Sequence, residues 1–422
     1  MVSEIEAMNV AIVGAGFTGL SAAFFLSKQK HKITVFEKED TLGGLSQTFR
    51  LPAWKWSVEK HYHHWFANDE SVLTLIKQLN LGNKLLFPKT ITCLYHKGKQ
   101  YPFDDPISVL TFPYLSFPQR LRTGIVTFLL KLLPALPAIN LEKYNACSWL
   151  KKYYGEQAYR IIWEPLLWGK FGKYAKEVNT AWFWARIKKR TPRLGYLEGG
   201  YQTLLSAIAS VIEKNNCRIL PGKSFDPLTT SLFDKVIITV PSPVFMKMYP
   251  RLPSSYKQQL GKIIHLDALS LLLTSKDKIL TDCYWLNILE RNYPFIALIQ
   301  HTNLVDSKYY ANQHLTWVAN YLPANHPYFK LSKEELFGIY LPFLKRINPN
   351  FDYQSSIVGY QLFRGLSAQP VFPIYYSRLR PDFKTPIPNV YLANMDMVYP
   401  WDRGTNYAIE LGRKVAEFVQ KD

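Results

Sequence analysis

The pattern of apolar and polar positions near the N-terminus predicts a strand, a helix and a second strand in close succession. Residues 9–13 (NVAIV) and 33–36 (ITVF) are short apolar runs, and residues 20–28 between them carry apolar side chains at helical spacing. Short apolar runs are typical of buried strands, and a longer periodic stretch between two of them is typical of a crossover helix. The pattern therefore predicts a β-α-β unit at the start of the chain.

Further along the chain, helical and strand patterns fall in separate blocks. Helical spacing predicts helices over 69–80, 144–160, 179–193, 201–214 and 333–346, and another helix ends at Pro165, before a loop shaped by Gly169 and Gly172. Strand patterns predict a hairpin over 91–95 and 99–103, strands at 218–220 and 233–241, and a strand-rich block over 262–363 that reads as a mostly antiparallel sheet, with strands at 268–274, 284–289, 295–301, 315–320 and 355–363. Since no repeat or low-complexity linker separates these blocks, we expect interleaved domains.

The turn at residues 14–19 (GAGFTG) gives the first unit its chemistry. Gly14 permits a tight turn, Gly16 lets the backbone approach a pyrophosphate, and Gly19 lets the helix pack closely on the strand. The helix N-terminus directs N–H groups and a partial positive charge at the phosphates. The alternative, a glycine turn without a ligand, does not explain why the motif stands between a strand and a helix, so the turn predicts an adenine-dinucleotide site.

Two features after the second strand extend this site. Glu37 ends that strand and can accept hydrogen bonds from a ribose diol, which disfavours a 2′-phosphate, although the neighbouring basic residues leave that point open. The pair Gly43-Gly44 follows at once and permits a second close backbone approach to the same pyrophosphate. A plain nicotinamide dehydrogenase does not need this second loop, and the alternative is an ordinary turn after a strand.

Composition narrows the classes of partner. The 422 residues carry a net charge of +19, and aromatic residues make up 15% of the chain, which suits a packed core and a pocket for a flat ligand. A basic surface favours acidic substrates, anionic lipid headgroups or nucleic acid, or is simply a solvated surface, and we find no nucleic-acid-binding motif. The four cysteines are far apart and the N-terminal MVSEIEA is not a signal peptide, so we expect reduced thiols and a cytoplasmic location.

Three histidines lie within the aromatic segment 54–66. On an extended strand, His61 and His63 share one face and His64 takes the other. Metal binding would need further ligands at suitable spacing, and we see none, so no metal is predicted. The remaining alternatives are that His61 or His63 lines the active site, or that all three are hydrogen-bonded structural residues.

Two further stretches leave alternatives open. Residues 125–139 are apolar apart from Lys131 and are too short to span a bilayer, while Arg120, Arg122 and Lys131 beside an apolar face suit a helix on a membrane surface. The other interpretation of 107–139 is a core or cavity-wall helix. Between 163 and 193, four side chains could meet an anionic or aromatic substrate, or could merely pack: Trp168, Lys170, Trp182 and Arg186.

Both ends of the chain resemble the FAD-dependent amine oxidase superfamily, and in particular its bacterial protoporphyrinogen-oxidase-like oxidoreductases. The resemblance lies in AIVGAGFTGLSAAFFL, ITVFEKEDTLGGLSQTF and the run from Asn389 to Ile409, and it is thin in the middle. Many members have Arg after the glycine pair where this chain has Leu45, so a contact to the pyrophosphate is missing or comes from elsewhere, for example from Arg50. Asn394 stands where members have glycine.

The resemblance implies an α/β fold with a discontinuous Rossmann-type FAD-binding domain over 1–66, 195–245 and 385–422. An α+β substrate domain is inserted, with a helical part over 67–194 and a mixed or antiparallel sheet over 246–384. The implied FAD-binding residues are Gly14, Ala15, Gly16, Phe17, Thr18, Gly19, Glu37, Lys38, Gly43, Gly44, Leu45, Lys223, Asn394, Gly404, Thr405, Asn406, Tyr407 and Ala408. The helix that starts at Thr405 would stabilise negative charge on the reduced flavin.

The function that follows is an FAD-dependent oxidoreductase that takes a hydride from a C–N or C–C bond of a small molecule, anionic or hydrophobic in character, onto flavin N5. His61, His63 and Arg403 are the expected residues of the reaction face. The alternative is a non-redox, flavin-dependent sugar-nucleotide mutase similar to UDP-galactopyranose mutases, and a third reading is a protein that uses FAD only structurally. If 107–139 meets a membrane, the protein would lie on its inner face.

Overall fold

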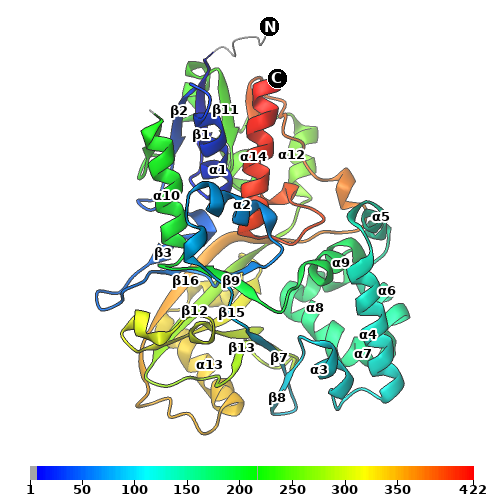
Figure 1. Ribbon diagram of the computed structural model, residues 1–422. Coiled ribbons are helices and arrows are strands. Elements are labelled where there is room, and N and C mark those ends of the chain that lie inside the picture. The colour runs from blue at the N-terminus through cyan, green and yellow to red at the C-terminus, as the bar shows by residue number, and fades with distance from the viewer. Residues whose placement is uncertain (1–6, 216) are drawn as a thin grey trace.

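A five-stranded parallel sheet organises the upper part of the molecule (Figure 1). The computed structural model describes residues 7–215 and 217–422, so the prediction for the N-terminal MVSEIEA lies almost wholly outside the described residues. The strand order is β10-β2-β1-β11-β17, and every neighbouring pair is parallel. The strands come from three separated stretches of chain: β1 (Asn9–Val13), β2 (Lys32–Phe36), β10 (Arg218–Leu220), β11 (Lys235–Ile238) and β17 (Val390–Leu392).

Alternating side chains of β1 enter two different cores. Val10 and Ile12 pack with α1 (Phe17–Ser27), α10 (Tyr201–Lys214) and α14 (Thr405–Lys421), whereas Ala11 and Val13 pack with α11 (Ser242–Met248) and α12 (Ser254–Gly261). A strand that is buried on both sides is apolar at every position, which is why this run is continuous rather than alternating. The helix α14 crosses α1 so closely that a Cβ at Gly412 would lie 2.3 Å from the Thr18 carbonyl oxygen.

A seven-stranded sheet forms the lower part, in the order β16-β12-β15-β14-β13-β7-β8. All neighbours are antiparallel except β13 and β7, so the prediction of a mostly antiparallel sheet is confirmed. The strands are β7 (Ile91–His96), β8 (Lys99–Pro102), β12 (His265–Ser275), β13 (Cys283–Ile288), β14 (Ala297–Gln300), β15 (His314–Leu322) and β16 (Ile357–Pro370). The hairpin β7–β8 therefore completes a sheet whose other strands come much later in the chain.

The two faces of this sheet pack into different hydrophobic cores. Leu269, Leu271 and Leu273 of β12 pack against α13 (Lys333–Ile347). On the opposite face, Leu272 of β12 and Trp317 of β15 join the core that holds α1 and α10. The period of two along a strand thus turns one set of side chains to a covering helix and the other toward the parallel sheet.

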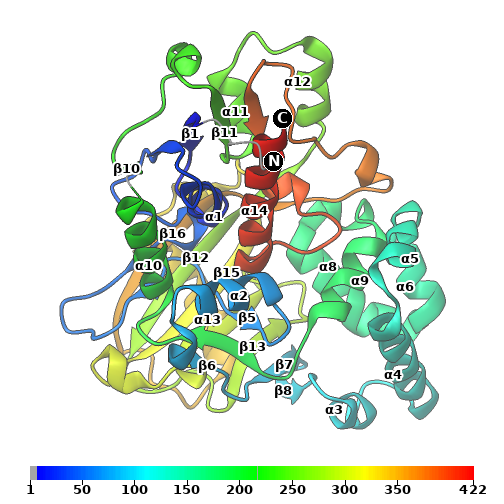
Figure 2. The same ribbon diagram turned by 45° about the horizontal axis from the view of Figure 1, so that its top comes forward.

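A helical part lies beside the sheet at the lower right of Figure 1 and remains separate in Figure 2. It contains α3 (Pro106–Thr111), α4 (Phe117–Leu132), α5 (Ala135–Ile139), α6 (Ala146–Tyr154), α7 (Glu156–Ala158), α8 (Glu164–Phe171) and α9 (Thr180–Lys189). Among the helices that the structure describes, none combines the length and the apolar character needed to cross a bilayer. The other elements are α2 (Glu70–Gln78) and the short strands β3 (Thr48–Phe49), β4 (Val58–Glu59), β5 (Trp65–Phe66), β6 (Leu85–Leu86) and β9 (Leu194–Leu197).

Two predictions in the helical part are wrong. The helix expected over 144–160 is broken at Gly155, whose φ of 89° interrupts the helical backbone between α6 and α7. Pro165 is the second residue of α8 rather than the end of a helix, and Gly169 lies within α8 instead of a loop. A wider π-helical turn, Tyr159–Trp163, runs directly into α8, so the helical backbone continues through Pro165.

Candidate functional site

The two glycine turns of the sequence lie side by side at the carboxyl ends of β1 and β2. The Gly43 N–H donates to the Ala15 carbonyl at 2.9 Å, and Gly16 and Gly43 form an isolated parallel bridge. A Cβ added to Gly16 would meet nothing closer than the Gly44 Cα, at 3.9 Å, so the space in front of Gly16 is open. The turn therefore forms a cradle that a side chain at Gly16 would fill, as a pyrophosphate site requires.

Gly14 and Gly19 are needed for the turn itself. Gly14 has a φ of 103°, and its Cβ would lie 2.6 Å from the Thr239 Oγ1, while a Cβ at Gly19 would lie 1.9 Å from the Gly14 carbonyl oxygen. These contacts match the roles predicted for the two glycines, a tight turn and close packing of α1 on β1. Phe17 and Thr18 open α1, whose N-cap, Gly16, has no capping side chain among the described residues.

Glu37 is buried at the end of β2, beside this cradle. Its Oε2 accepts from the Ala15 N–H at 2.8 Å and its Oε1 from the Glu39 N–H at 3.1 Å, so each oxygen keeps room for another donor. The Lys223 N–H donates to the Glu37 carbonyl at 2.8 Å, which places this residue next to the predicted ribose end. The Lys38 side chain pairs with Glu39 at the surface, and Arg50 is exposed.

The start of α14 forms the other end of the candidate site. The hydroxyl of Thr405 is buried and has no hydrogen-bond partner among the described residues. The N-cap residue of α14 is Gly404, and no described side chain caps this helix start. The Tyr407 and Ala408 N–H groups both donate to the Gly404 carbonyl at 3.1 Å, so the helix start offers the N–H groups of Thr405 and Asn406. An orphaned hydroxyl, an uncapped helix start and the glycine cradle together fit an extended FAD.

Two of the predicted binding residues use their side chains elsewhere. Asn406 Oδ1 accepts from the Val72 N–H at 3.1 Å at the start of α2, and the Tyr407 ring stacks on Trp401. The Asn406 side-chain carbonyl oxygen and the face of the Tyr407 ring are therefore engaged within the protein, while the Tyr407 hydroxyl has no hydrogen-bond partner among the described residues. Asn394 donates to the Val240 carbonyl and to Ser242 Oγ at 3.1 and 3.0 Å, so the side chain that replaces glycine there joins the loops after β11 and β17.

The predicted histidines lie behind the second glycine turn. His61 Nδ1 is 2.8 Å from Ser270 Oγ on β12, and His63 Nε2 is 3.1 Å from Ser46 Oγ, just after Gly44. Burial lowers the pKa of His61 to about 3 and that of His63 to about 4, yet both side chains remain partly accessible. Desolvated side chains that keep some accessible surface line an internal space, and both imidazoles are neutral at physiological pH.

Close approach of the backbone shapes this space. A Cβ at Gly365 of β16 would lie 2.7 Å from His61 Nε2 and 2.9 Å from Leu45 Cδ2. Leu45 therefore packs between the glycine turn and the sheet, instead of presenting a charge to the pyrophosphate. His64 bonds through Nδ1 to the Tyr284 hydroxyl at 3.0 Å, apart from its two neighbours.

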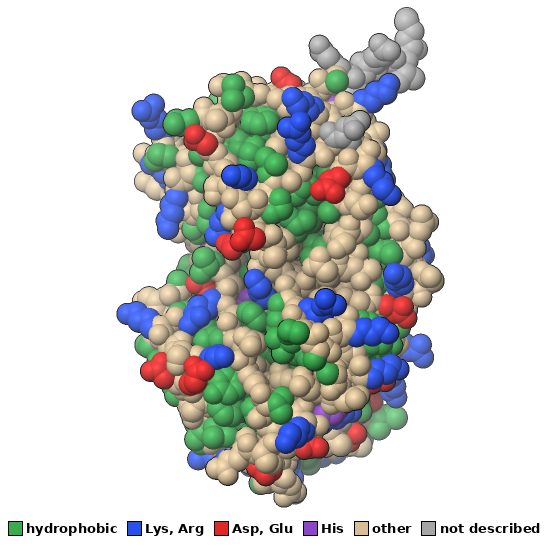
Figure 3. Space-filling view, turned by 90° about the vertical axis from the view of Figure 1, so that its left-hand side faces the viewer, with side chains coloured by type: hydrophobic (Ala, Val, Ile, Leu, Met, Phe, Trp, Pro, Cys, Tyr) green, Lys and Arg blue, Asp and Glu red, His purple; other side chains and the backbone are tan. Residues whose placement is uncertain are grey.

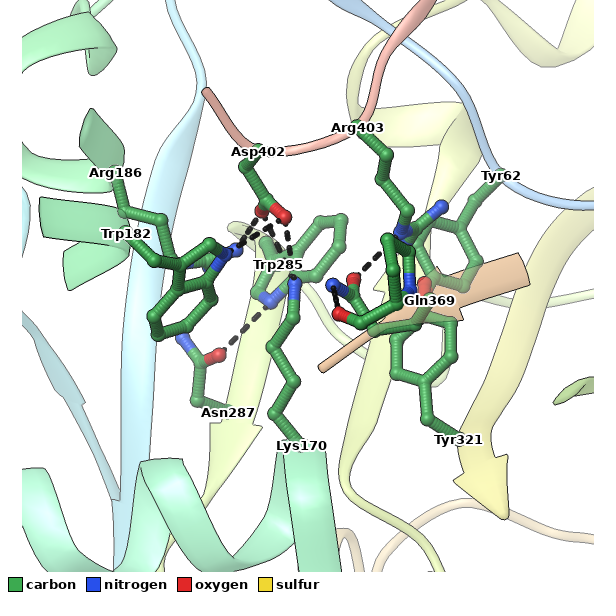
Figure 4. A network of polar contacts seen from close by, with 11 residues as sticks. Tyr62, Lys170, Trp182, Arg186, Trp285, Asn287, Tyr321, Gln369, Asp402 and Arg403 are labelled. Carbon is green, nitrogen blue, oxygen red and sulfur yellow. Dashed lines mark hydrogen bonds and ion pairs between the residues drawn. The ribbon is translucent and has the colours of Figure 1, made fainter. Parts of the chain in front are cut away.

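A polar cluster brings side chains from distant segments to the loop that precedes α14 (Figure 4). Asp402 accepts from Lys170 Nζ at 3.0 Å, from Trp182 Nε1 at 3.1 Å, and from Arg186. Lys170 rises from α8, and Trp182 and Arg186 lie four residues apart on one face of α9. The sequence had offered these three residues for substrate contact, whereas Trp168 of the same group is exposed under Arg291.

Arg403 projects into the same region with little to neutralise it. Its Nε donates to Gln369 Oε1 at 2.9 Å, and its guanidinium lies 4.6 Å from the centre of the Tyr321 ring, whose hydroxyl is 2.8 Å from that of Tyr62. No carboxylate of the described residues lies within ion-pair distance of Arg403. Sequence reasoning did not identify Tyr62, Tyr321, Gln369 or Asp402, and only Asp402 carried a signal, as the neighbour of Arg403.

Burial and mutual repulsion set the protonation of this cluster. Burial, then the charges of Arg186 and Arg403, hold the pKa of the Lys170 amine well below its usual value, against the attraction of Asp402. Burial also lowers the pKa of Arg403, and the charge of Arg186 adds to this shift. Burial opposes ionisation of Asp402, but Lys170 and Arg186 hold its pKa below its usual value, so it stays ionised.

The described residues contain no group of three or more His, Cys, Asp or Glu side chains placed to share a metal ion. Within that part of the chain, neither the polar cluster nor the two histidines therefore forms a metal site. All four cysteines are free thiols, three of them buried.

A family profile matches nearly the whole chain. The profile of the family described as flavin containing amine oxidoreductase matches residues 17–419. The 15-cis-phytoene desaturase of Synechococcus elongatus is 33% identical over 116 residues, which are 26% of this chain and 21% of that enzyme. Coproporphyrinogen III oxidase of Staphylococcus aureus is 20% identical over 302 residues, 58% of this chain and 63% of that enzyme. The chain thus spans less than two thirds of the length of these two relatives.

Solved structures share the fold over the full chain. Cyclohexylamine oxidase from Brevibacterium oxydans superposes with a TM-score of 0.72 at 14% identity, covering 99% of both chains. Reduced UDP-galactopyranose mutase superposes with a TM-score of 0.75 at 15% identity, covering 98% of this chain and 94% of the mutase. At these identities the likeness shows the fold alone.

Proposed function

The chain belongs to the family of flavin-containing amine oxidoreductases and is an FAD-dependent oxidoreductase, and we propose that it oxidises a C–N or C–C bond of a small molecule. When bound, FAD supplies the hydride acceptor, at its N5. The observation that carries the proposal is the meeting of the glycine cradle at Gly16 and Gly44 with the uncapped start of α14 at Thr405. This pairing supports a cofactor that stretches from one to the other.

The residues of the chain would bind, orient and exclude water. Gly16 and Gly44 leave room for phosphates, Glu37 accepts from a ribose, and the N–H groups at the start of α14 stabilise negative charge on the ring system. His61 and His63 are neutral, so they can act as hydrogen-bond partners, but they hold no proton to donate as cations, and their low pKa values make them weak bases. With Arg403, they remain our proposed residues of the reaction face.

Anaerobic reduction tests this function. The purified protein should contain FAD, identified by its absorbance and by mass spectrometry after release. A candidate substrate should bleach that absorbance without oxygen, and an electron acceptor should restore it. The mutase alternative predicts the opposite pattern, in which chemically reduced enzyme isomerises a sugar nucleotide and no donor is consumed. A protein that retains FAD but shows neither behaviour would support the purely structural use of the cofactor.

A separate observation supports contact with a membrane surface. Along α4, the exposed residues Phe117, Leu121, Ile125, Phe128 and Leu132 recur every three or four positions, so they form one outward stripe, and only Thr123 and Leu130 of this helix are buried. Leu136, on the following helix α5, is 87% exposed. The helix lies at the outer edge of the helical part (Figures 1 and 2). An amphipathic helix normally turns its apolar face inward, so this stripe calls for a covering partner.

We propose an anionic leaflet as that partner, at the cytoplasmic face. Between Pro106 and Asn140 the sequence has three cationic residues and no acidic one, which suits anionic headgroups. Arg122 and Lys131 are exposed beside the stripe. On the face of the molecule shown in Figure 3, by contrast, Lys and Arg side chains are spread among other residues rather than gathered beside an apolar helix.

Vesicle co-sedimentation tests the membrane contact. The protein should sediment with phosphatidylserine-containing vesicles at low salt and be released as salt rises. The variant Phe128→Ser/Leu132→Ser should lose most of this binding. A matched control, Leu228→Ser/Leu232→Ser, changes two leucines that are 89% and 69% exposed outside the stripe, and should bind like the wild type. Equal binding by both variants, or no binding at low salt, would refute the proposal.

A further inference from the structure

We infer that the space beside the start of α14 binds an anionic group of the substrate, a carboxylate or a phosphate, between Arg403 on one side and Lys170 with Arg186 on the other. This inference rests on the proposed function, because it names the substrate class of the same site. It also excludes a protonated amine from the position next to Arg403.

Cationic side chains outnumber carboxylates in this cluster. Lys170, Arg186 and Arg403 converge on this space, and Asp402 is the carboxylate that pairs with the first two, through Nζ at 3.0 Å and through the Arg186 guanidinium. Lys170 and Asp402 are largely buried, with side-chain exposures of 11% and 20%. Arg186 is 31% exposed and Arg403 is partly buried, so the positive charge left over is partly desolvated, and a neighbouring anion would stabilise it. The protein itself does not supply that group within the described residues, so the ligand is expected to do so.

Most of the hydrogen-bond donors of Arg403 are unused among the described residues. Arg403 has five N–H groups, and the single hydrogen bond that it makes to the described residues uses Nε. Its Nη groups are free to take a bidentate oxyanion, the geometry for which a guanidinium is suited. Gln369, which holds Nε, is itself fixed by donating from Nε2 to the Pro370 carbonyl at 2.9 Å. Arg403 is thus held in place with its unpaired edge open.

Asp402 has little accepting capacity left for a cationic ligand. Its two oxygens already accept from three donors, on Lys170, Trp182 and Arg186 (Figure 4). An ammonium group here would face the three cations and a carboxylate whose charge is already shared. Aromatic side chains border the cluster: Tyr321 lies under Arg403, and Tyr62, whose hydroxyl is 2.8 Å from that of Tyr321, packs edge-on against Trp285. A flat body that bears an anionic group therefore matches the site better than an amine.

Isothermal calorimetry on the flavin-loaded protein tests this inference, with three probes that share one ring: benzoate, phenyl phosphate and benzylamine. Benzoate or phenyl phosphate should bind and benzylamine should not. The anion that binds more tightly shows whether the site prefers a carboxylate or a phosphate. Arg403→Gln should weaken anion binding by at least about tenfold. The control Arg413→Gln, on the exposed side of α14, should not change it.

A second variant should act in the opposite direction. Asp402→Asn removes the internal carboxylate that competes for Lys170 and Arg186, so it should strengthen anion binding by roughly three- to tenfold, which damage to the fold would not do. The inference is overturned if benzylamine binds more tightly than both anions, if neither anion binds, or if Arg403→Gln behaves like Arg413→Gln. If the purified protein holds no flavin, the proposed function fails, while calorimetry on that protein still reports whether Arg403 binds anions.

Discussion

Replacement of Gly16 should separate cofactor binding from folding. Gly16 has φ −73° and ψ 175°, an extended conformation that any residue adopts, and a Cβ there would meet only the Gly44 Cα at 3.9 Å. The protein alone therefore has room for a side chain at this position. The same methyl group would occupy the cradle in which we place the pyrophosphate, so the cost of the substitution should fall on the ligand.

The structure sets the expected sizes. Gly16→Ala should leave the flavin-free protein as stable as the wild type, or more stable by about 0.4–1 kcal/mol, because the unfolded chain loses freedom. It should weaken FAD binding at least about tenfold, which is roughly 1.4 kcal/mol, and the larger Gly16→Val should weaken it further. Gly19→Ala differs in kind, because its methyl would lie 1.9 Å from the Gly14 carbonyl oxygen and should destabilise the protein by about 1–3 kcal/mol or more.

The assay has two readings on each variant. Urea denaturation of the flavin-free protein gives the free energy of unfolding, and quenching of flavin fluorescence on titration gives the dissociation constant of FAD. We expect the Gly16 variants to raise the dissociation constant of FAD without lowering the free energy of unfolding, and Gly19→Ala to lower the free energy of unfolding. If Gly16→Val binds FAD as the wild type does, the cradle is not the pyrophosphate site and our placement of the cofactor is wrong.

Two further predictions concern buried charge. Burial raises the pKa of fully buried Glu59 from 4.5 to about 7, although Tyr196 and the Tyr201 N–H donate to it, so the native state binds the extra proton between these values. The free energy of unfolding should fall by up to about 3 kcal/mol as pH rises from 4.5 to about 7, and Glu59→Gln, which cannot ionise, should not show this fall. If urea denaturation gives the same pH dependence of the unfolding free energy for the wild type and for Glu59→Gln, the prediction is wrong. Asp402→Asn should lower the free energy of unfolding by about 2 kcal/mol. This is less than the roughly 3–5 kcal/mol expected for a fully buried ion pair, because the Asp402 side chain is 20% exposed. An unchanged denaturation midpoint would show that the ion pair does not stabilise the protein.

Features that depend on neighbouring residues could be predicted from the sequence. The strand at 9–13 and the helix at 201–214 have the predicted bounds, because apolar periodicity is a local property. Gly14 and Gly19 of the first turn have the predicted contacts, since a positive φ at Gly14 and a contact below van der Waals distance at Gly19 allow no other residue, whereas Gly16 leaves open space in front of it. The predicted helix over 144–160 failed because a single glycine, Gly155, outweighed a favourable period.

By itself, then, the sequence predicted that an adenine dinucleotide is held at a glycine turn, and the resemblance of the C-terminal helix predicted that this dinucleotide is FAD. The tertiary structure alone decided which charges meet. Asp402 is more than 200 residues away from both Lys170 and Arg186 along the chain, and no local pattern indicates that α8, α9 and the loop before α14 converge. It also decided that the apolar face of α4 turns outward. Periodicity states that a helix has an apolar face, but what covers that face is set by the packing of the whole chain.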